Sequence, residues 1–400
     1  MQQSKWNDVK KLIQGLFYLP EWHLQRLHKR DKNLWIFDAW SGNRYSDNPR
    51  ALYEYILAHR KDIRAVWITN NDAVYRRLKE EGKPVTLRSC KEGKAIQKDA
   101  GVFFCTHGRL NGESEGDLQY MNGIRYINLW HGAPLKQIGK DERRLVVKTT
   151  MWKRIKTWIR RCLVPWEFIH GEMINSSPFF APYFASAFGK DYKMIDAAEP
   201  RLDKLVSSGS ECLIDEINRR FNHPTKILYM PTFRDSQFGA FNPFAEAGFD
   251  RERIENLLEE QNSVLLYKSH FLDSQNGVVQ ISKRIIVIGD NDYDDLYTFI
   301  KDVDILITDY SSVYFDFLCL RKPIILFPYD YDEYVQHSRP FYFDYQLMEA
   351  KKVYSWQEME DCLKNKTYYP PSDAEIQRFR PLPIGNCCEE LFNKIIANND

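Results

Sequence analysis

The residues best suited to chemistry lie at 127–136, which read I-N-L-W-H-G-A-P-L-K. His131 ends an apolar run, Gly132 allows a close backbone approach, and Pro134 fixes the exit from the turn. We therefore expect the side chains of His131 and Lys136 to face a cleft. A proton acceptor beside a cation suits chemistry on a phosphorylated substrate. The alternative is a hydrogen-bonded core histidine beside a solvated lysine.

A second group of polar residues lies at 304–316, which read D-I-L-I-T-D-Y-S-S-V-Y-F-D. The apolar run 305–308 predicts a strand that leads into Asp309, and Ser311 or Ser312 could cap a helix beginning at Val313. Such a strand-to-helix corner leaves free N–H groups on the ligand side of a parallel sheet, which suits a phosphate. Plain capping, worth about 1 kcal/mol, is the alternative.

The elements that must position these residues alternate along the chain. Apolar runs at 34–37, 65–68, 102–105, 126–130, 226–230, 263–268, 285–288, 305–308 and 324–327 predict strands, and 49–60, 73–81, 251–260 and 293–301 predict helices. This alternation indicates an α/β fold with helices covering parallel sheets. Breaks at 207–210 and 222–224 favour two domains, 1–205 and 206–400, with the final helix packing back on the first.

Ligands of open parallel sheets bind beyond the carboxyl ends of the strands. The segments 130–131, 231–234, 268–270 and 308–312 each follow an apolar run, so we expect them to meet at one cleft. The acidic run 290–295 departs from a calcium loop, with Asp295 at the glycine position and Lys301 at the glutamate position. We interpret it as a solvated loop leading into a helix.

Several linked motifs resemble those of the CDP-glycerol glycerophosphotransferase family. They are W-H-G-A-P-L-K at 130–136, P-T-F-R at 231–234, Y-K-S-H at 267–270 and T-D-Y-S-S-V-Y-F-D-F at 308–317, in the family's order. D-A-W-S-G-N-R-Y-S-D-N-P-R-A-L-Y at 38–53, A-E-P-R-L-D at 198–203 and K-P-I-I-L-F-P-Y-D-Y-D-E-Y at 322–334 are similar to family segments too.

The resemblance implies two Rossmann-like domains facing a cleft, a GT-B type architecture. It also implies transfer of a polyol phosphate from a CDP-activated donor to a hydroxyl of a lipid-linked or growing polymer acceptor, with release of CMP. Teichoic acid or capsule-polymer synthesis would be the setting. Glycerol is the favoured polyol, while ribitol, and single transfer against polymerisation, stay open.

Within this resemblance we assign the catalytic base to His131, with His270 as the second catalytic candidate or a hydrogen-bond donor to the pyrophosphate. The residues expected to bind the donor are Arg234, Lys268, Thr308, Asp309, Ser311 and Ser312. Asp309 could instead orient His270, and Asp316 could pair with a neighbouring cation. Because no D-x-D motif ends a strand of the expected cleft, we predict no metal and no cofactor.

Composition narrows the partners. The 400 residues carry a formal net charge of +1, so no global field favours nucleic acid. The eight cysteines show no C-x-x-C spacing and no pairing with histidines typical of a zinc site. No signal peptide and no apolar stretch of about 20 residues is present, which predicts a cytoplasmic protein.

Residues 151–163, M-W-K-R-I-K-T-W-I-R-R-C-L, place Trp152, Ile155, Ile159 and Cys162 on one helical face and five basic residues on the others. That pattern is typical of a helix lying in an anionic membrane surface, and residues 6–17 are similar. We therefore predict peripheral association with the inner face of the cell membrane. An ordinary surface helix packed on its own domain is the alternative.

Two other functions stay open from the sequence. One is a GT-B glycosyltransferase that uses a sugar nucleotide, and the other is a non-catalytic protein of capsule assembly.

Overall fold

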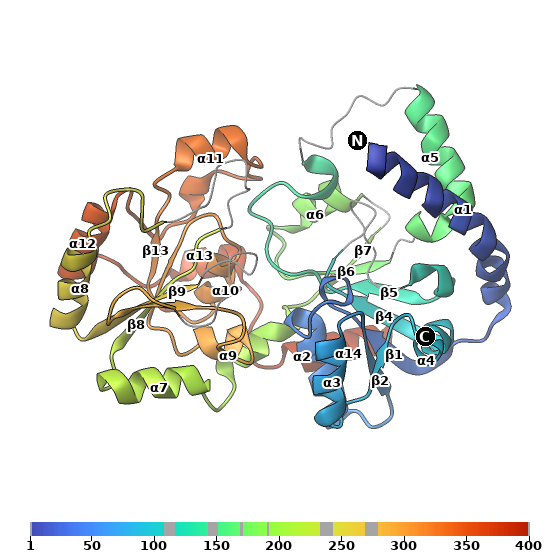
Figure 1. The fold of residues 1–400 in the computed structure, drawn as a ribbon, viewed down its shortest axis with the longest axis horizontal. Helices are drawn as coiled ribbons and strands as arrows, with labels where there is room; N and C mark the ends of the chain where they lie inside the picture. Colours follow the sequence, from blue (N-terminus) through green and yellow to red (C-terminus); the bar gives the residue numbers. More distant parts are fainter. Residues whose placement is uncertain are drawn as a thin grey trace.

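The computed structural model describes residues 2–107, 117–142, 151–168, 171–189, 192–232, 243–268 and 279–398. Figure 1 shows two lobes side by side, each built on a sheet covered by helices. The first sheet has the order β3-β2-β1-β4-β5-β6-β7 and the second has the order β10-β11-β9-β8-β12-β13-β14. Neighbouring strands run parallel except β10 and β11. The predicted α/β class with two Rossmann-like halves is confirmed.

The first sheet contains β1 (Asp31–Phe37), β2 (Arg64–Thr69), β3 (Val85–Leu87), β4 (Ala100–Cys105), β5 (Arg125–Asn128), β6 (Glu172–Asn175) and β7 (Lys193–Asp196). The second contains β8 (Thr225–Tyr229), β9 (Ser263–Lys268), β10 (Val279–Gln280), β11 (Ile285–Ile288), β12 (Ile305–Thr308), β13 (Ile324–Leu326) and β14 (Lys351–Lys352).

The α-helices follow the same division. Those before the second sheet are α1 (Gln2–Leu24), α2 (Asp47–His59), α3 (Asp72–Glu80), α4 (Lys91–Asp99), α5 (Met151–Leu163), α6 (Ala181–Phe188) and α7 (Cys212–Phe221). The later ones are α8 (Arg251–Glu260), α9 (Leu296–Ile300), α10 (Val313–Leu318), α11 (Tyr331–His337), α12 (Trp356–Asn365), α13 (Asp373–Phe379) and α14 (Cys387–Ala397).

Helices cover both faces of the first sheet, which explains why β1 reads as an apolar run. Trp35 and Phe37 pack into one core cluster with residues of α2 and α14, while Leu34 and Ile36 pack into another with residues of α1 and α4. Strands buried on both faces need apolar side chains at every position. Figure 1 shows α14 under the first lobe, beside α2, although the second sheet precedes it in the chain.

Local hydrogen bonds explain two of the differences between the observed and the expected element boundaries. β5 ends at Asn128 instead of 130, because its side-chain Oδ1 accepts the Trp130 N–H (2.8 Å) and Trp130 turns to φ 51°. The helix expected at 293–301 shrinks to α9, because Asp295 caps it by accepting the N–H groups of Tyr297 and Thr298.

The two lobes are joined by more than the chain. One apolar cluster contains residues of both, such as Trp130 and Leu135 of the first and Phe315 of the second. Main-chain hydrogen bonds also cross over, from Gln137 N to the Pro340 carbonyl (2.7 Å) and from Tyr342 N to the Leu135 carbonyl (2.9 Å). The cleft between the sheets is therefore closed on the side where residues 135–137 meet residues 340–342.

Candidate active site

The turn after β5 holds His131 in a constrained place. Trp130 has φ 51° and Gly132 has φ 145°, both in the region that side chains disfavour. Asn48 at the start of α2 fixes the turn by donating its side-chain amide to the carbonyls of Leu129 (2.9 Å) and Trp130 (3.0 Å). A bulky residue keeps such a conformation where its surroundings enforce it, which is common at functional sites.

The hydrogen bonding of His131 fixes its proton. Nδ1 lies 3.0 Å from the Thr106 carbonyl, which can only accept, so Nδ1 carries the hydrogen and Nε2 keeps its lone pair. The ring stacks on His107, with centroids 4.4 Å apart. Burial, followed by the charge of His107, lowers the pKa of His131 to about 4. At neutral pH the imidazole is uncharged and can accept a proton.

The serine corner of the second lobe lies directly against this turn. A Cβ added to Gly132 would sit 2.8 Å from Oγ of Ser312, so glycine is needed for the close approach. The Ser312 side chain makes no cap hydrogen bond, and Ser311 Oγ accepts the Val313 N–H at a long 3.4 Å. Because α10 has six residues, its dipole is small, and the corner offers a ligand its hydroxyls and backbone N–H groups.

Both corners line one cavity of about 1070 Å³ between the lobes. Its walls include residues from each of the segments expected to converge: 130–136, 231–232, Lys268 and 310–312. The cleft inferred from the strand ends is thus present. His270 and Arg234 lie outside the described residues.

The expected donor-binding residues of the described chain fall into two groups. Ser311, Ser312 and Lys268 line the cavity, and Nζ of Lys268 also pairs with Asp290 (2.8 Å). Thr308 and Asp309 are fully buried and do not line it. Thr308 Oγ1 donates to the Met230 carbonyl (2.7 Å), and Asp309 Oδ1 accepts the Thr232 N–H (2.7 Å). We propose that these two hold the loop after β8 instead of touching the donor.

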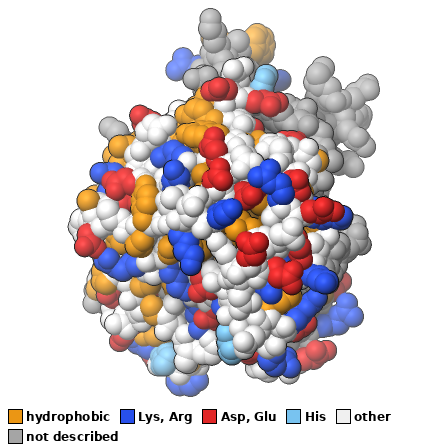
Figure 2. Space-filling model, turned by 90° about the vertical axis from the view of Figure 1, so that its left-hand side faces the viewer, with side chains coloured by type: hydrophobic (Ala, Val, Ile, Leu, Met, Phe, Trp, Pro, Cys, Tyr) orange, Lys and Arg blue, Asp and Glu red, His pale blue; other side chains and the backbone are white. Residues whose placement is uncertain are grey.

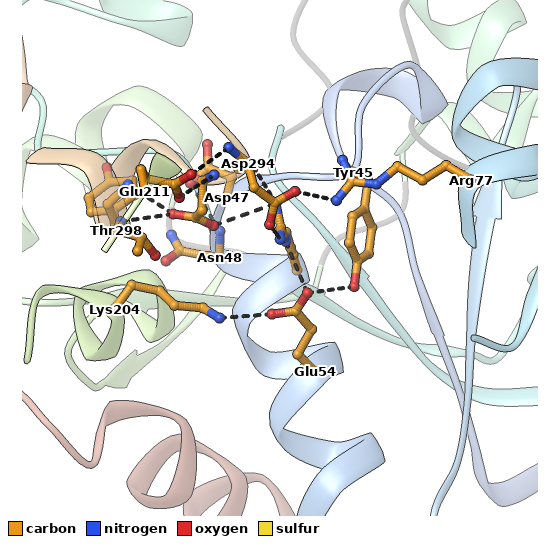
Figure 3. Close-up of polar contacts among 12 residues, drawn as sticks. Tyr45, Asp47, Asn48, Glu54, Arg77, Lys204, Glu211, Asp294 and Thr298 are labelled. Atoms are coloured by element: carbon orange, nitrogen blue, oxygen red, sulfur yellow. Dashed lines mark hydrogen bonds and ion pairs between the residues drawn. The ribbon is translucent and has the colours of Figure 1, made fainter. Parts of the chain in front are cut away.

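The run 290–295 is a loop that leads into α9, as predicted, and Asn291 and Asp294 are exposed. Its carboxylates also pair with arginines of the first lobe, which was not predicted: Asp290 with Arg44 (3.0 Å), and Asp294 with Arg50 (2.5 Å) and Arg77. Figure 3 shows the Asp294 carboxylate facing Arg77. Oppositely charged side chains from the two lobes therefore meet at the rim of the cavity.

A buried ionic network forms part of the cavity wall, which Asp47, Arg201 and Asp316 line. Arg201 donates to Asp47 (2.6 Å) and Asp316 (2.9 Å), and Arg380 donates to Glu199 (2.5 Å) and Asp316. The expected pairing of Asp316 with a cation is confirmed, with two arginines instead of one. The network joins the first lobe, the second lobe and the segment before α14.

Comparisons with known proteins match this arrangement. The model of the CDP-Glycerol:Poly(glycerophosphate) glycerophosphotransferase family matches residues 21–383. The chain belongs to this family.

The relatives of the glycerophosphotransferase chain act in teichoic acid synthesis by name. A teichoic acid glycerol-phosphate transferase of Staphylococcus aureus is 30% identical over 85% of this chain and 85% of that protein. The teichoic acid poly(glycerol phosphate) polymerase of Bacillus subtilis is 28% identical over 84% of this chain, which spans 44% of that polymerase. The solved structure of the wall teichoic acid polymerase TagF has a TM-score of 0.70 at 23% identity, covering 98% of this chain and 97% of that one, and so shares the GT-B type fold.

Sequence reasoning overlooked several residues that shape the glycerophosphotransferase site. Arg44 belongs to the motif at 38–53 and Arg201 to the one at 198–203, and both motifs were noted without roles for their charges. Thr106 and His107 directly follow β4, so the rule that selected the other strand ends would have found them too. Among the residues that the structure describes, no three His, Cys, Asp or Glu are grouped to hold a metal ion.

Proposed function

We propose that this chain transfers glycerol phosphate from CDP-glycerol to a hydroxyl of a polyol-phosphate acceptor in teichoic acid synthesis and releases CMP. The observation that carries the proposal is the neutral imidazole of His131, with Nε2 free to accept, held against the Ser311–Ser312 corner in one cavity. The family match favours this reaction over use of a sugar nucleotide, and glycerol is the polyol that the relatives' names carry.

The reaction needs a base and a set of donors around the pyrophosphate. The acceptor oxygen attacks the phosphorus that carries glycerol, and its proton passes to Nε2 of His131. A new P–O bond forms as the bond from that phosphorus to the bridging oxygen breaks, and CMP leaves with the electron pair. Ser311, Ser312 and Lys268, with Arg234 and His270, are the residues we propose to bind the developing negative charge.

A histidine whose pKa is about 4 is a weak base, and we propose that substrate binding raises this pKa. A nearby pyrophosphate favours the charged imidazolium and so raises the pKa of His131. His131 would therefore be a stronger base when the anionic donor is bound than in the free protein.

The direct test measures CMP release from CDP-glycerol with a lipid-linked glycerol-phosphate acceptor. We expect His131→Gln to lower turnover by roughly 10²- to 10⁴-fold, since the general base is lost. CDP-glycerol binding, measured by calorimetry, should persist. His59→Gln, an exposed histidine of α2, is the matched control and should keep normal turnover. Near-normal turnover of His131→Gln would refute the base assignment. A melting temperature of the protein that rises with UDP but not with CMP would refute the donor class.

We also propose that α1 and α5 attach the protein to an anionic membrane surface, where a lipid-linked acceptor would lie. The two helices lie together at the outer edge of the first lobe (Figure 1). Their large apolar side chains are exposed, with Phe17 at 78%, Trp152 at 74% and Trp158 at 66%. Arg154 and Lys156 are exposed beside them. This exposure favours the membrane reading over an ordinary surface helix.

The charge distribution elsewhere supports a local attachment. On the outer face of the second lobe, acidic and basic side chains are interspersed (Figure 2). None of the helices in the described part of the chain combines the length and apolarity needed to cross a bilayer. The proposed surface is therefore a feature of α1 and α5, and binding to vesicles tests it.

A further inference from the structure

Two arginines at the rim of the cavity are paired in a way that an anion could replace. Arg44 and Arg77 keep 33% and 44% of their side chains exposed, and their partners Asp290 and Asp294 keep 30% and 51%. Ion pairs at such exposure are weak. Arg50 differs, because it is 5% exposed and also pairs with Glu54 and Asp295, and we regard it as a fixed structural link.

An aromatic side chain connects Arg44 to His131. The ring of Trp40 lies 5.4 Å from the His131 ring, and the Arg44 guanidinium lies 5.6 Å from the Trp40 ring centroid. Trp40 adopts φ 51°, and its N–H donates to Oγ1 of Thr106 (2.9 Å). Since the Thr106 carbonyl also holds His131, one residue fixes the base and the aromatic ring relative to each other.

His131, Trp40 and Arg44 present a base, an aromatic face and a guanidinium in that order, which matches the groups of one terminal polyol-phosphate unit. A terminal polyol phosphate has a hydroxyl to deprotonate, a carbon chain whose C–H groups suit an aromatic face, and a phosphodiester that suits a guanidinium. Trp40, Arg44 and Arg77 all line the same cavity as His131.

We propose that Trp40, Arg44 and Arg77 form the acceptor subsite, which binds the terminal polyol-phosphate units of the acceptor. In the free protein, Asp290 holds Arg44, while Asp294 and Glu81 hold Arg77, and the acceptor's phosphates displace Asp290 and Asp294. The exchange replaces one charge-assisted contact by another, so it requires little rearrangement. This inference rests on the proposed function, because that function supplies the phosphate-bearing acceptor.

The alternative is that the same ion pairs serve only as a latch that holds the lobes together. The latch and the subsite predict different signs for the effects of the two variants on acceptor affinity. In a latch, removal of either partner breaks the same contact, so both changes shift kinetics in one direction. In a subsite, the arginine binds substrate and the carboxylate competes with it, so the two changes have opposite effects on acceptor affinity.

Arg77 and Asp294 provide the cleaner test, because Asp290 also binds Lys268, a proposed donor-binding residue, whereas the second partner of Asp294 is the structural link Arg50. We would measure KM for CDP-glycerol and for a short poly(glycerol phosphate) acceptor. We expect Arg77→Gln to raise the acceptor KM roughly tenfold or more, and Asp294→Asn to lower it, with the donor KM unchanged in both. Arg76→Gln, an exposed neighbour on α3 that does not line the cavity, should leave the acceptor KM unchanged.

Acceptors of different chemistry separate the parts of the subsite. With free glycerol as the acceptor, Arg77→Gln should have no effect, whereas Trp40→Leu should raise KM for both acceptors. Shifts of the same sign in Arg77→Gln and Asp294→Asn, or a change in donor KM alone, would overturn the subsite. Failure of the wild-type protein to release CMP with any acceptor would instead refute the proposed function.

Discussion

At the scale of single residues, the site is organised around Thr106. Its carbonyl sets the tautomer of His131, while its hydroxyl is bonded to Nδ1 of His107 (2.8 Å) and to the N–H of Trp40 (2.9 Å). The W-H-G motif was enough to single out His131 from the sequence. The strand-end rule points to Thr106 after β4, but its contact with His131 was not predictable, because it is made by a main-chain carbonyl that any residue possesses.

The pH dependence of the reaction follows from the surroundings of His131. An ordinary histidine pKa is 6.5, whereas burial and the neighbouring His107 lower that of His131 to about 4. His131 therefore stays neutral between these values, where an ordinary histidine would be protonated. We expect kcat/KM, which reports the free enzyme, to stay level from pH 7.5 to about 5.5 and to fall only near the lowered pKa.

A variant checks the cause of this behaviour. His107→Asn removes the second-largest cause of the lowered pKa, so the acid limb of the kcat/KM profile should move to higher pH while burial keeps it below 6.5. Circular dichroism over the same range separates this effect from unfolding. An acid limb near 6.5 in the wild-type protein would contradict the proposed environment of His131.

At the scale of elements, the strands buried on both faces were located most accurately from the sequence. β9, β11 and β12 were located to the residue, because central strands covered on both faces read as unbroken apolar runs. Short strands at or near the sheet edges, such as β3 and β14, were overlooked, since they carry few apolar residues and their pairing is set by the neighbouring strand. α5 is the opposite case, where a clear pattern marks a helix whose large apolar side chains are mostly exposed, with Leu163 at its end packed against the core.

Vesicle flotation tests the proposed role of α5. We expect the wild-type protein to float with vesicles that contain phosphatidylglycerol and less with phosphatidylcholine alone. The double variant Arg154→Glu with Lys156→Glu should bind at least about tenfold more weakly, since each basic residue near such a surface contributes on the order of 1 kcal/mol. Trp152→Ala with Trp158→Ala should also bind less, because apolar area is lost.

The matched control for that experiment, with the same change in total charge, is Arg219→Glu with Arg220→Glu. Arg219 and Arg220 are exposed on α7, which Figure 1 shows on the second lobe, away from α5. Equal loss of binding in this variant would mean that total charge, and not the α5 surface, drives attachment.

At the scale of the whole molecule, the relation between the lobes depends on contacts that are distant in sequence. Arg201 reaches Asp316 across 115 positions, and Arg380 reaches Glu199 across 181. The sequence predicted two α/β halves and a cleft between them, because both follow from local patterns. It could not pair these charges, since a buried ion pair leaves no periodic signal. The partners of Asp290 and Asp294 were overlooked because they too are distant in sequence.

The segment before α14 allows the buried network to be tested by stability. Arg380 is 2% exposed and donates to Glu199 of the first lobe and Asp316 of the second, so Arg380→Ala leaves two buried carboxylates with one partner fewer. We expect the free energy of unfolding, measured by urea denaturation, to fall by about 3–5 kcal/mol. Arg378, in α13 of the same segment, makes a partly exposed pair with Glu349. Arg378→Ala should therefore lower the free energy of unfolding by at most about 1 kcal/mol. Equal losses in the two variants would mean that the apolar cluster shared by the lobes, and not the ionic network, holds them together.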